Sequence, residues 1–115
     1  MTVEQKAIAP GIQLLALNGR LVLGRESQQF EKQVEELAKA GNLKLILDMS
    51  QVPYVDSAGL GALVGCNSKV KNAGGEMRLV GVEARVLQLL KLAFLDSIFA
   101  IDMTVADASK ALGAN

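Results

Sequence analysis

The sequence predicts an α/β domain with a mostly parallel sheet, and three observations lead to that prediction. Short runs of apolar residues near the N-terminus give way to segments whose apolar residues lie three and four positions apart, as one helix face requires. The expected order is strand, strand, helix, and then strand and helix three times in succession. One middle strand is apolar on both faces, which is typical of a central strand covered by helices. Strands that alternate with helices form right-handed crossovers and therefore a largely parallel sheet.

The N-terminal half is expected to form three strands and one helix. The strands are Val3 to Ala9, Ile12 to Leu17 and Leu43 to Leu47, with Pro10-Gly11 and Asn18-Gly19 as turns. The helix runs from Ser27 to Ala40, because its apolar residues share one face and its charged residues the other. Gly41-Asn42 then ends this helix.

The C-terminal half is expected to form three helices and two strands. Pro53 disfavours helical backbone at Val52, so the next helix begins near Asp56 or Ser57, and Gly74-Gly75 ends it. The remaining elements are a strand at Met77 to Val80, a helix at Ala84 to Leu92, a strand at Ile101 to Met103 and a helix at Val105 to Leu112. The whole chain, 1–115, is expected to be one domain of about five strands and four helices.

The composition excludes several kinds of chemistry. The chain has no histidine, so a Ser-His-Asp or Cys-His catalytic arrangement has no imidazole base. Its single cysteine, Cys66, rules out an internal disulfide and is too few for a structural zinc site. Twelve basic residues balance twelve acidic ones, which argues against a protein that binds nucleic acid directly. We therefore expect no enzymatic activity, no metal and no cofactor.

The hydropathy pattern indicates a cytoplasmic protein without direct membrane insertion. The N-terminal segment carries Glu4 and Lys6 and has no long apolar run, which is unlike a signal peptide or a membrane anchor. Apolar stretches elsewhere fall far short of the roughly 20 residues that span a bilayer.

Several single residues are expected to serve the core or the surface rather than a reaction. The widely spaced aromatic residues are expected in the core, and they are Phe30, Tyr54, Phe94 and Phe99. Cys66 is expected to be small and buried or half-buried. Gly61 and Gly65 are better explained by close packing of a helix on the sheet than by a dinucleotide-binding loop. The expected solvated cations are Lys69, Lys71 and Arg78.

The loop from Asp48 to Gly61 carries most of the functional information. Loops at the carboxyl ends of parallel strands are where ligands and partners meet open α/β sheets. Ser57 is expected at the cap or in the first turn of the following helix, where its hydroxyl can accept from a free backbone N–H. The alternative interpretation is a regulatory phosphorylation site, because a helix N-terminus tolerates a phosphate. Asp48 and Asp56 are expected to orient backbone rather than form a catalytic pair. An aspartate-phosphorylated receiver domain is discarded, since no acidic pair follows the first strand.

The run LILDMSQVPYVDSAGLGALVG, from Leu45 to Gly65, resembles the signature of STAS domains, and specifically that of bacterial anti-sigma factor antagonists. The turn at Gly74-Gly75 and the segment from Leu90 to Ile101 resemble later parts of the same family. The resemblance covers nearly the whole chain and implies the STAS fold, in the order β-β-α-β-α-β-α-β-α.

The resemblance also implies a protein-interaction switch. Members bind a serine kinase that acts as an anti-sigma factor, and this binding frees the sigma factor. The kinase phosphorylates the serine after the Asp of the signature, here Ser57, which releases the antagonist, and a serine/threonine phosphatase resets it. The implied partner-binding residues are Asp48, Asp56, Ser57, Ala58, Gly59, Leu60 and Gly61.

Two departures from the family pattern bear on the partner. Many members have acidic residues in the turn after the second strand, where this chain has Gly19-Arg20-Leu21-Val22. Phe94 stands where the family often has glycine, and it is expected in the core or, alternatively, as an exposed anchor. Within the same family, the alternative function is an adaptor or scaffold subunit of a stress-sensing or membrane lipid-transport complex, with Ser57 only a helix cap.

Overall fold

The computed structural model describes residues 1–114, and within them all nine expected elements are present in the predicted order. They are β1 (Thr2–Ala9), β2 (Ile12–Asn18), α1 (Arg25–Ala38), β3 (Lys44–Gln51), α2 (Ser57–Asn72), β4 (Glu76–Val80), α3 (Ala84–Leu92), β5 (Ala100–Asp102) and α4 (Val105–Ala111). The ends differ from the sequence-based bounds by a few residues, chiefly where β3 continues beyond its apolar stretch to Gln51.

The sheet has the order β1-β2-β3-β4-β5, so neighbours in sequence are neighbours in space. The β1–β2 pair is an antiparallel hairpin, and its turn contains Gly11 with a φ of 77°. All later pairs are parallel. β3 therefore lies in the middle of the sheet, and Leu45, Ile46 and Leu47 are fully buried. The predicted mostly parallel α/β sheet with a central apolar strand is confirmed.

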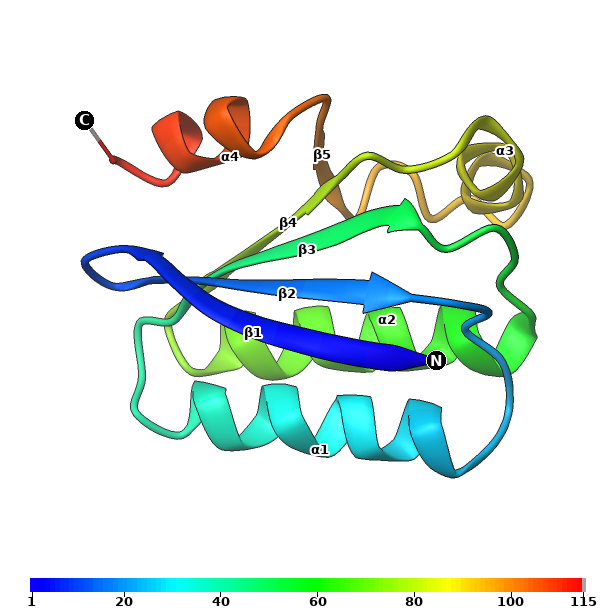
Figure 1. The fold of residues 1–115 in the computed structure, drawn as a ribbon, viewed down its shortest axis with the longest axis horizontal. Helices are drawn as coiled ribbons and strands as arrows, with labels where there is room; N and C mark the ends of the chain where they lie inside the picture. Colours follow the sequence, from blue (N-terminus) through cyan, green and yellow to red (C-terminus); the bar gives the residue numbers. More distant parts are fainter. Residues whose placement is uncertain (115) are drawn as a thin grey trace.

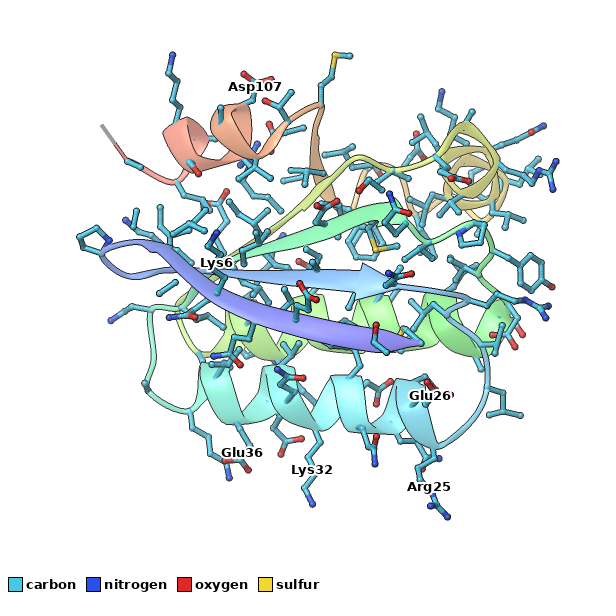
Figure 2. The ribbon with its side chains drawn as sticks, viewed as in Figure 1. Lys6, Arg25, Glu26, Lys32, Glu36 and Asp107 are labelled. Carbon is cyan, nitrogen blue, oxygen red and sulfur yellow. The ribbon has the colours of Figure 1, made fainter. Side chains whose placement is uncertain are left out.

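The two faces of the sheet have unequal cores. Leu45, Leu47 and Met49 point into the larger core, which α1 and α2 cover. Ile46 points the other way, into a small core closed by Ala108 and Leu112 at α4. Figure 1 shows α1 and α2 side by side below the sheet, α4 above it, and α3 beyond the arrowheads of β2 and β3. The outer side of α1 is charged, and in Figure 2 Arg25, Lys32 and Glu36 point away from the sheet.

Five of the single-residue expectations are now decided by burial. Phe30 and Phe99 lie in the core, as predicted, and Cys66 is fully buried. Burial raises the pKa of the Cys66 thiol to about 12, which makes the thiol a poor nucleophile. Tyr54 and Phe94 contradict the core expectation, because their exposed fractions are 42% and 85%.

The position of Phe94 explains its exposure. It follows the C-cap of α3, where its N–H donates to the carbonyl of Lys91 (3.1 Å) and the N–H of Leu95 donates to that of Leu90 (2.8 Å). This pair of hydrogen bonds is the Schellman motif, whose penultimate position takes left-handed backbone and favours glycine. Phe94 has a φ of 57°. The helix ends at Leu92, two residues earlier, so its periodicity does not place the Phe94 side chain in the core.

Arg78 is also not the solvated residue that we expected. Its side chain is 19% exposed, and its guanidinium donates to Asp102 across the β4–β5 pair (Nε to Oδ2, 2.6 Å) and to Glu76 (Nη1 to Oε2, 2.5 Å). These carboxylates raise the pKa of Arg78, with Asp102 the larger cause. Arg78 on β4 therefore stabilises the pairing of the short edge strand β5 with β4.

None of the helices in residues 1–114 combines the length and the apolar character needed to cross a membrane.

Candidate functional site

The cap of α2 is built from the Asp56 carboxylate and two separate parts of the chain. Oδ1 of Asp56 accepts from the N–H of Gly59 in the first turn of α2 (2.8 Å). Oδ2 accepts from the N–H of Leu23 in the loop between β2 and α1 (3.0 Å). The backbone N–H of Asp56 in turn donates to the carbonyl of Leu21 (3.2 Å). One side chain thus closes the helix end and holds a second loop against it.

These hydrogen bonds keep Asp56 ionised. The N–H of Leu23 is the main cause of a lowered pKa, the N–H of Gly59 the next, and the nearby charge of Arg20 adds to it, while desolvation opposes the shift. The site therefore carries a carboxylate at neutral pH. Its expected role, to orient backbone, is confirmed for Asp56.

Ser57 occupies the first position of α2, and it is not the cap. The cap residue is Asp56, and the exposed Ser57 hydroxyl has no hydrogen-bond partner among the described residues. The expectation that this hydroxyl satisfies a backbone N–H is therefore wrong. An aspartate one residue earlier reaches the third N–H of the helix with the geometry that capping requires. The Ser57 hydroxyl is left directed at solvent beside a helix N-terminus, where a phosphate would meet the positive end of the helix dipole.

Gly59 is the glycine at which α2 packs closely, rather than Gly61 or Gly65. A Cβ on Gly59 would lie 2.2 Å from the carbonyl oxygen of Leu21 and 2.8 Å from Cγ1 of Val55. A Cβ on Gly61 or Gly65 would meet nothing within 4 Å. The close-packing explanation is therefore wrong for these two glycines. Gly61 lies one turn after Ser57 on the exposed side of α2, and it keeps that surface low.

Asp48 lies apart from the other candidate residues. Side chains alternate along a strand, so Asp48 shares the face of Ile46, which is opposite to the one that α2 covers. Its Oδ1 accepts from the N–H of Ser50 (3.0 Å), which confirms its expected role in orienting the chain after β3. The structure thus brings together residues 56–61 and places Asp48 on the other side of the sheet.

Within that group, burial separates the exposed residues from the supporting ones. Ser57 and Gly61 are exposed, Ala58 and Leu60 are half-buried, and Gly59 is buried. Leu60 also packs against the larger core. The surface that a partner can touch is therefore centred on Ser57 and Gly61, and Gly59 supports it from beneath.

The loop between β2 and α1 adds residues that the sequence reasoning did not assign to the site. Leu21 forms a parallel bridge with Val55, and its N–H donates to the carbonyl of Tyr54 (3.0 Å). Arg20 lies over the Tyr54 ring, with its guanidinium carbon 4.9 Å from the ring centroid, in a cation–π contact. The departure at Arg20 from the family pattern was the only sequence signal that pointed to this loop.

A comparison with families of known proteins bears on this site directly. The family model described as the STAS domain matches residues 5–108. The chain belongs to the STAS domain family. The match includes the whole loop from Asp48 to Gly61 and all of α2, so the cap and the exposed serine described above are features of a STAS domain.

Two curated relatives indicate what similar STAS domains do. A Thermotoga neapolitana protein, named as a candidate anti-sigma factor antagonist, is 35% identical over 80 residues, or 69% of this chain and 71% of its own length. The anti-sigma-B factor antagonist of Bacillus subtilis is 34% identical over 71 residues, which cover 62% of this chain and 63% of that protein.

Solved structures confirm the STAS fold. The crystal structure of a candidate anti-sigma factor antagonist from Thermotoga maritima matches with a TM-score of 0.85 and 28% identity over 96% of this chain and 93% of that chain. The phosphorylated form of SpoIIAA, a cell fate determinant of Bacillus, matches with a TM-score of 0.75 over 96% and 99% of the two chains. Its 14% identity makes it evidence for the fold alone.

Proposed function

We propose that this STAS domain is an anti-sigma factor antagonist that binds a serine-kinase anti-sigma factor through the N-terminal end of α2, and that phosphorylation of Ser57 releases it. The names of the curated relatives support the antagonist function. The observation that carries the switch is the exposed Ser57 hydroxyl, which lies at the first position of α2 and is not needed for the cap.

The charge of the cap gives phosphorylation its effect. Phosphoserine adds about −1.5 to −2 charges at neutral pH. That charge would lie one residue from the Asp56 carboxylate, whose lowered pKa keeps it ionised. The fold accommodates the phosphate at the helix N-terminus. The partner surface is then one that fits the Asp56 carboxylate and the small residues at the start of α2. The added charge of the phosphate would repel it. A serine/threonine phosphatase would restore the binding form.

The proposal is tested by capture from a lysate of the source organism with paired baits. One bait is the unmodified chain and the other is the chain phosphorylated at Ser57. We expect the unmodified bait to hold a kinase of the ATPase type and the phosphorylated bait to lose it. Retention of the same membrane or scaffold proteins by both baits would instead favour the adaptor or scaffold function.

Two variants separate charge from position. Ser57→Asp places a second carboxylate beside Asp56 and should weaken kinase binding. Ser68→Asp adds the same charge to an exposed position near the other end of α2 and should not. Ser57→Ala should bind the kinase, resist phosphorylation and unfold at the urea concentration of the parent, because Asp56 supplies the cap. Equal binding by both aspartate variants and the parent would remove the electrostatic basis of release.

A further inference from the structure

A second surface, next to the phosphorylation site, has the character of a binding groove. It has a volume of about 350 Å³ and lies between the loop that precedes α2 and one face of α3. Pro53 and Tyr54 form one wall, and the α3 wall includes Val86, Leu89 and Leu92. We refer to it below as the α3 groove. The solvent-accessible apolar side chains of this wall are the half-buried Leu89 and the exposed Leu92, which lie three positions apart on α3, and Arg85 and Gln88 flank them.

The C-terminal end of α3 carries large apolar side chains that the core of the monomer does not bury. Leu92, which lines the α3 groove, is 69% exposed, and Phe94, two residues later, is 85% exposed. Phe94 also holds left-handed backbone at a position that favours glycine. A large aromatic side chain in solvent gains little from burial in the monomer and sits on strained backbone. Exposed aromatic and leucine anchors of this kind are typical of protein interfaces.

The charge at the α3 groove is positive. Arg85 is the charged side chain among its lining residues, and Gln88 is the other polar one. Arg20 lies over the ring of Tyr54, with its guanidinium carbon 4.9 Å from the centroid, but it does not line the groove. Glu83, the N-cap residue of α3, is close in sequence but does not line the groove. A ligand with apolar side chains beside carboxylates therefore complements both the shape and the charge.

The α3 groove is continuous with the site of the proposed function. Tyr54 lies in the same loop as Asp56 and Ser57, and its carbonyl accepts from Leu21, whose own carbonyl holds Asp56. We propose that the α3 groove binds an amphipathic segment of the anti-sigma kinase, in which apolar side chains enter the groove and a neighbouring carboxylate pairs with Arg85. This inference rests on the proposed function, and it assigns partner selectivity to a surface that does not include Ser57.

The test measures the affinity of the purified kinase, obtained with the unmodified bait, for four variants of the full chain. Arg85→Glu and Leu92→Ser alter the α3 groove. Arg25→Glu and Met103→Ser make the same kinds of change at exposed positions elsewhere, and Figure 2 shows Arg25 at the start of α1, away from α3. We expect each groove variant to bind about tenfold more weakly, as interface anchors do, and each control to bind like the parent. Raising the salt concentration should reduce the loss caused by Arg85→Glu.

The outcomes distinguish this inference from the proposed function. If both groove variants bind like the parent while phosphorylation of Ser57 still releases the kinase, the α3 groove is not a docking site and the switch stands. If the groove variants lose affinity but phosphorylation has no effect, the groove binds the partner and the release mechanism is wrong. Tighter binding by Arg85→Glu would show that the ligand does not present a carboxylate to Arg85, and it would overturn the proposal. Sedimentation that shows self-association of the parent, abolished by Leu92→Ser, would assign the groove to a second copy and overturn the proposal.

Discussion

The packing of α2 against the loop after β2 predicts opposite effects for alanine at two neighbouring glycines. A Cβ on Gly59 would lie 2.2 Å from the carbonyl oxygen of Leu21, whereas a Cβ on Gly61 would meet open space. Ordinary contact needs more than 3 Å, so Gly59→Ala forces α2 and the loop apart by about 1 Å. Gly61→Ala only replaces glycine with a better helix former.

The change in the free energy of unfolding follows from the cost of the close contact and the gain in helix propensity. Forcing an extra carbon into a packed contact typically costs about 1 to 3 kcal/mol, and the shift also lengthens the 2.8 Å hydrogen bond from the Gly59 N–H to Asp56. The gain in helix propensity returns about 1 kcal/mol at most. We expect Gly59→Ala to lower the free energy of unfolding by about 2 kcal/mol, and Gly61→Ala to raise it by about 0.5 to 1 kcal/mol.

Urea unfolding followed by circular dichroism measures both effects. For a urea m value near 2 kcal/mol per molar, the two midpoints should differ by about 1.5 M. The m value should stay the same, because neither substitution changes the surface exposed on unfolding. Equal midpoints for the two variants, or a higher midpoint for Gly59→Ala, would show that the Leu21 carbonyl does not limit the approach of α2.

Three further predictions concern Asp56, Phe94 and Cys66. The pKa of Asp56 is lowered in the folded protein, so its stabilising contribution is present above the unfolded value near 4 and is lost as the pH falls through the folded pKa. The urea midpoint of the parent should therefore fall more steeply from pH 6 to about pH 2 than that of Asp56→Asn. Phe94→Gly should raise the free energy of unfolding by about 0.5 to 1 kcal/mol in a thermal melt, since it relieves left-handed backbone; an unchanged or lower melting temperature would contradict this. The Cys66 thiol should react with a disulfide reagent at pH 8 only when urea unfolds the chain, and fast reaction in native buffer would show that it is accessible.

The sequence predicted the fold well because the signals for it are local. Alternating strand and helix periods, the turn residues and the central strand that is apolar on both faces each depend on a few adjacent residues. The resulting order admits few topologies. The start of α2 near Asp56 or Ser57 was predicted for the same reason, since Pro53 limits how early a helix can begin.

The details of the site depend on contacts between distant segments, and these were predicted less well. Asp and Ser are both good N-cap residues, so their adjacency did not reveal which one caps α2. The second oxygen of Asp56 binds Leu23, 33 residues earlier, and no local pattern reports that bond. Which glycine faces its neighbour depends on how α2 is rotated about its axis, and the sequence pattern assigned close packing to Gly61 and Gly65 rather than to Gly59. Phe94 was misplaced because it lies just beyond the helix whose period was being read.

The division of labour between Asp56 and Ser57 has a consequence for the lifetime of the protein. Because the cap is a carboxylate and the neighbouring hydroxyl holds nothing in place, a group attached to that hydroxyl changes the surface and leaves the helix end intact. Modified and unmodified chains should then populate unfolded forms equally rarely, and proteases and chaperones would treat them alike. A cell could add and remove the group many times on the same molecule, with the response set by the ratio of the two forms and the total amount of protein unchanged.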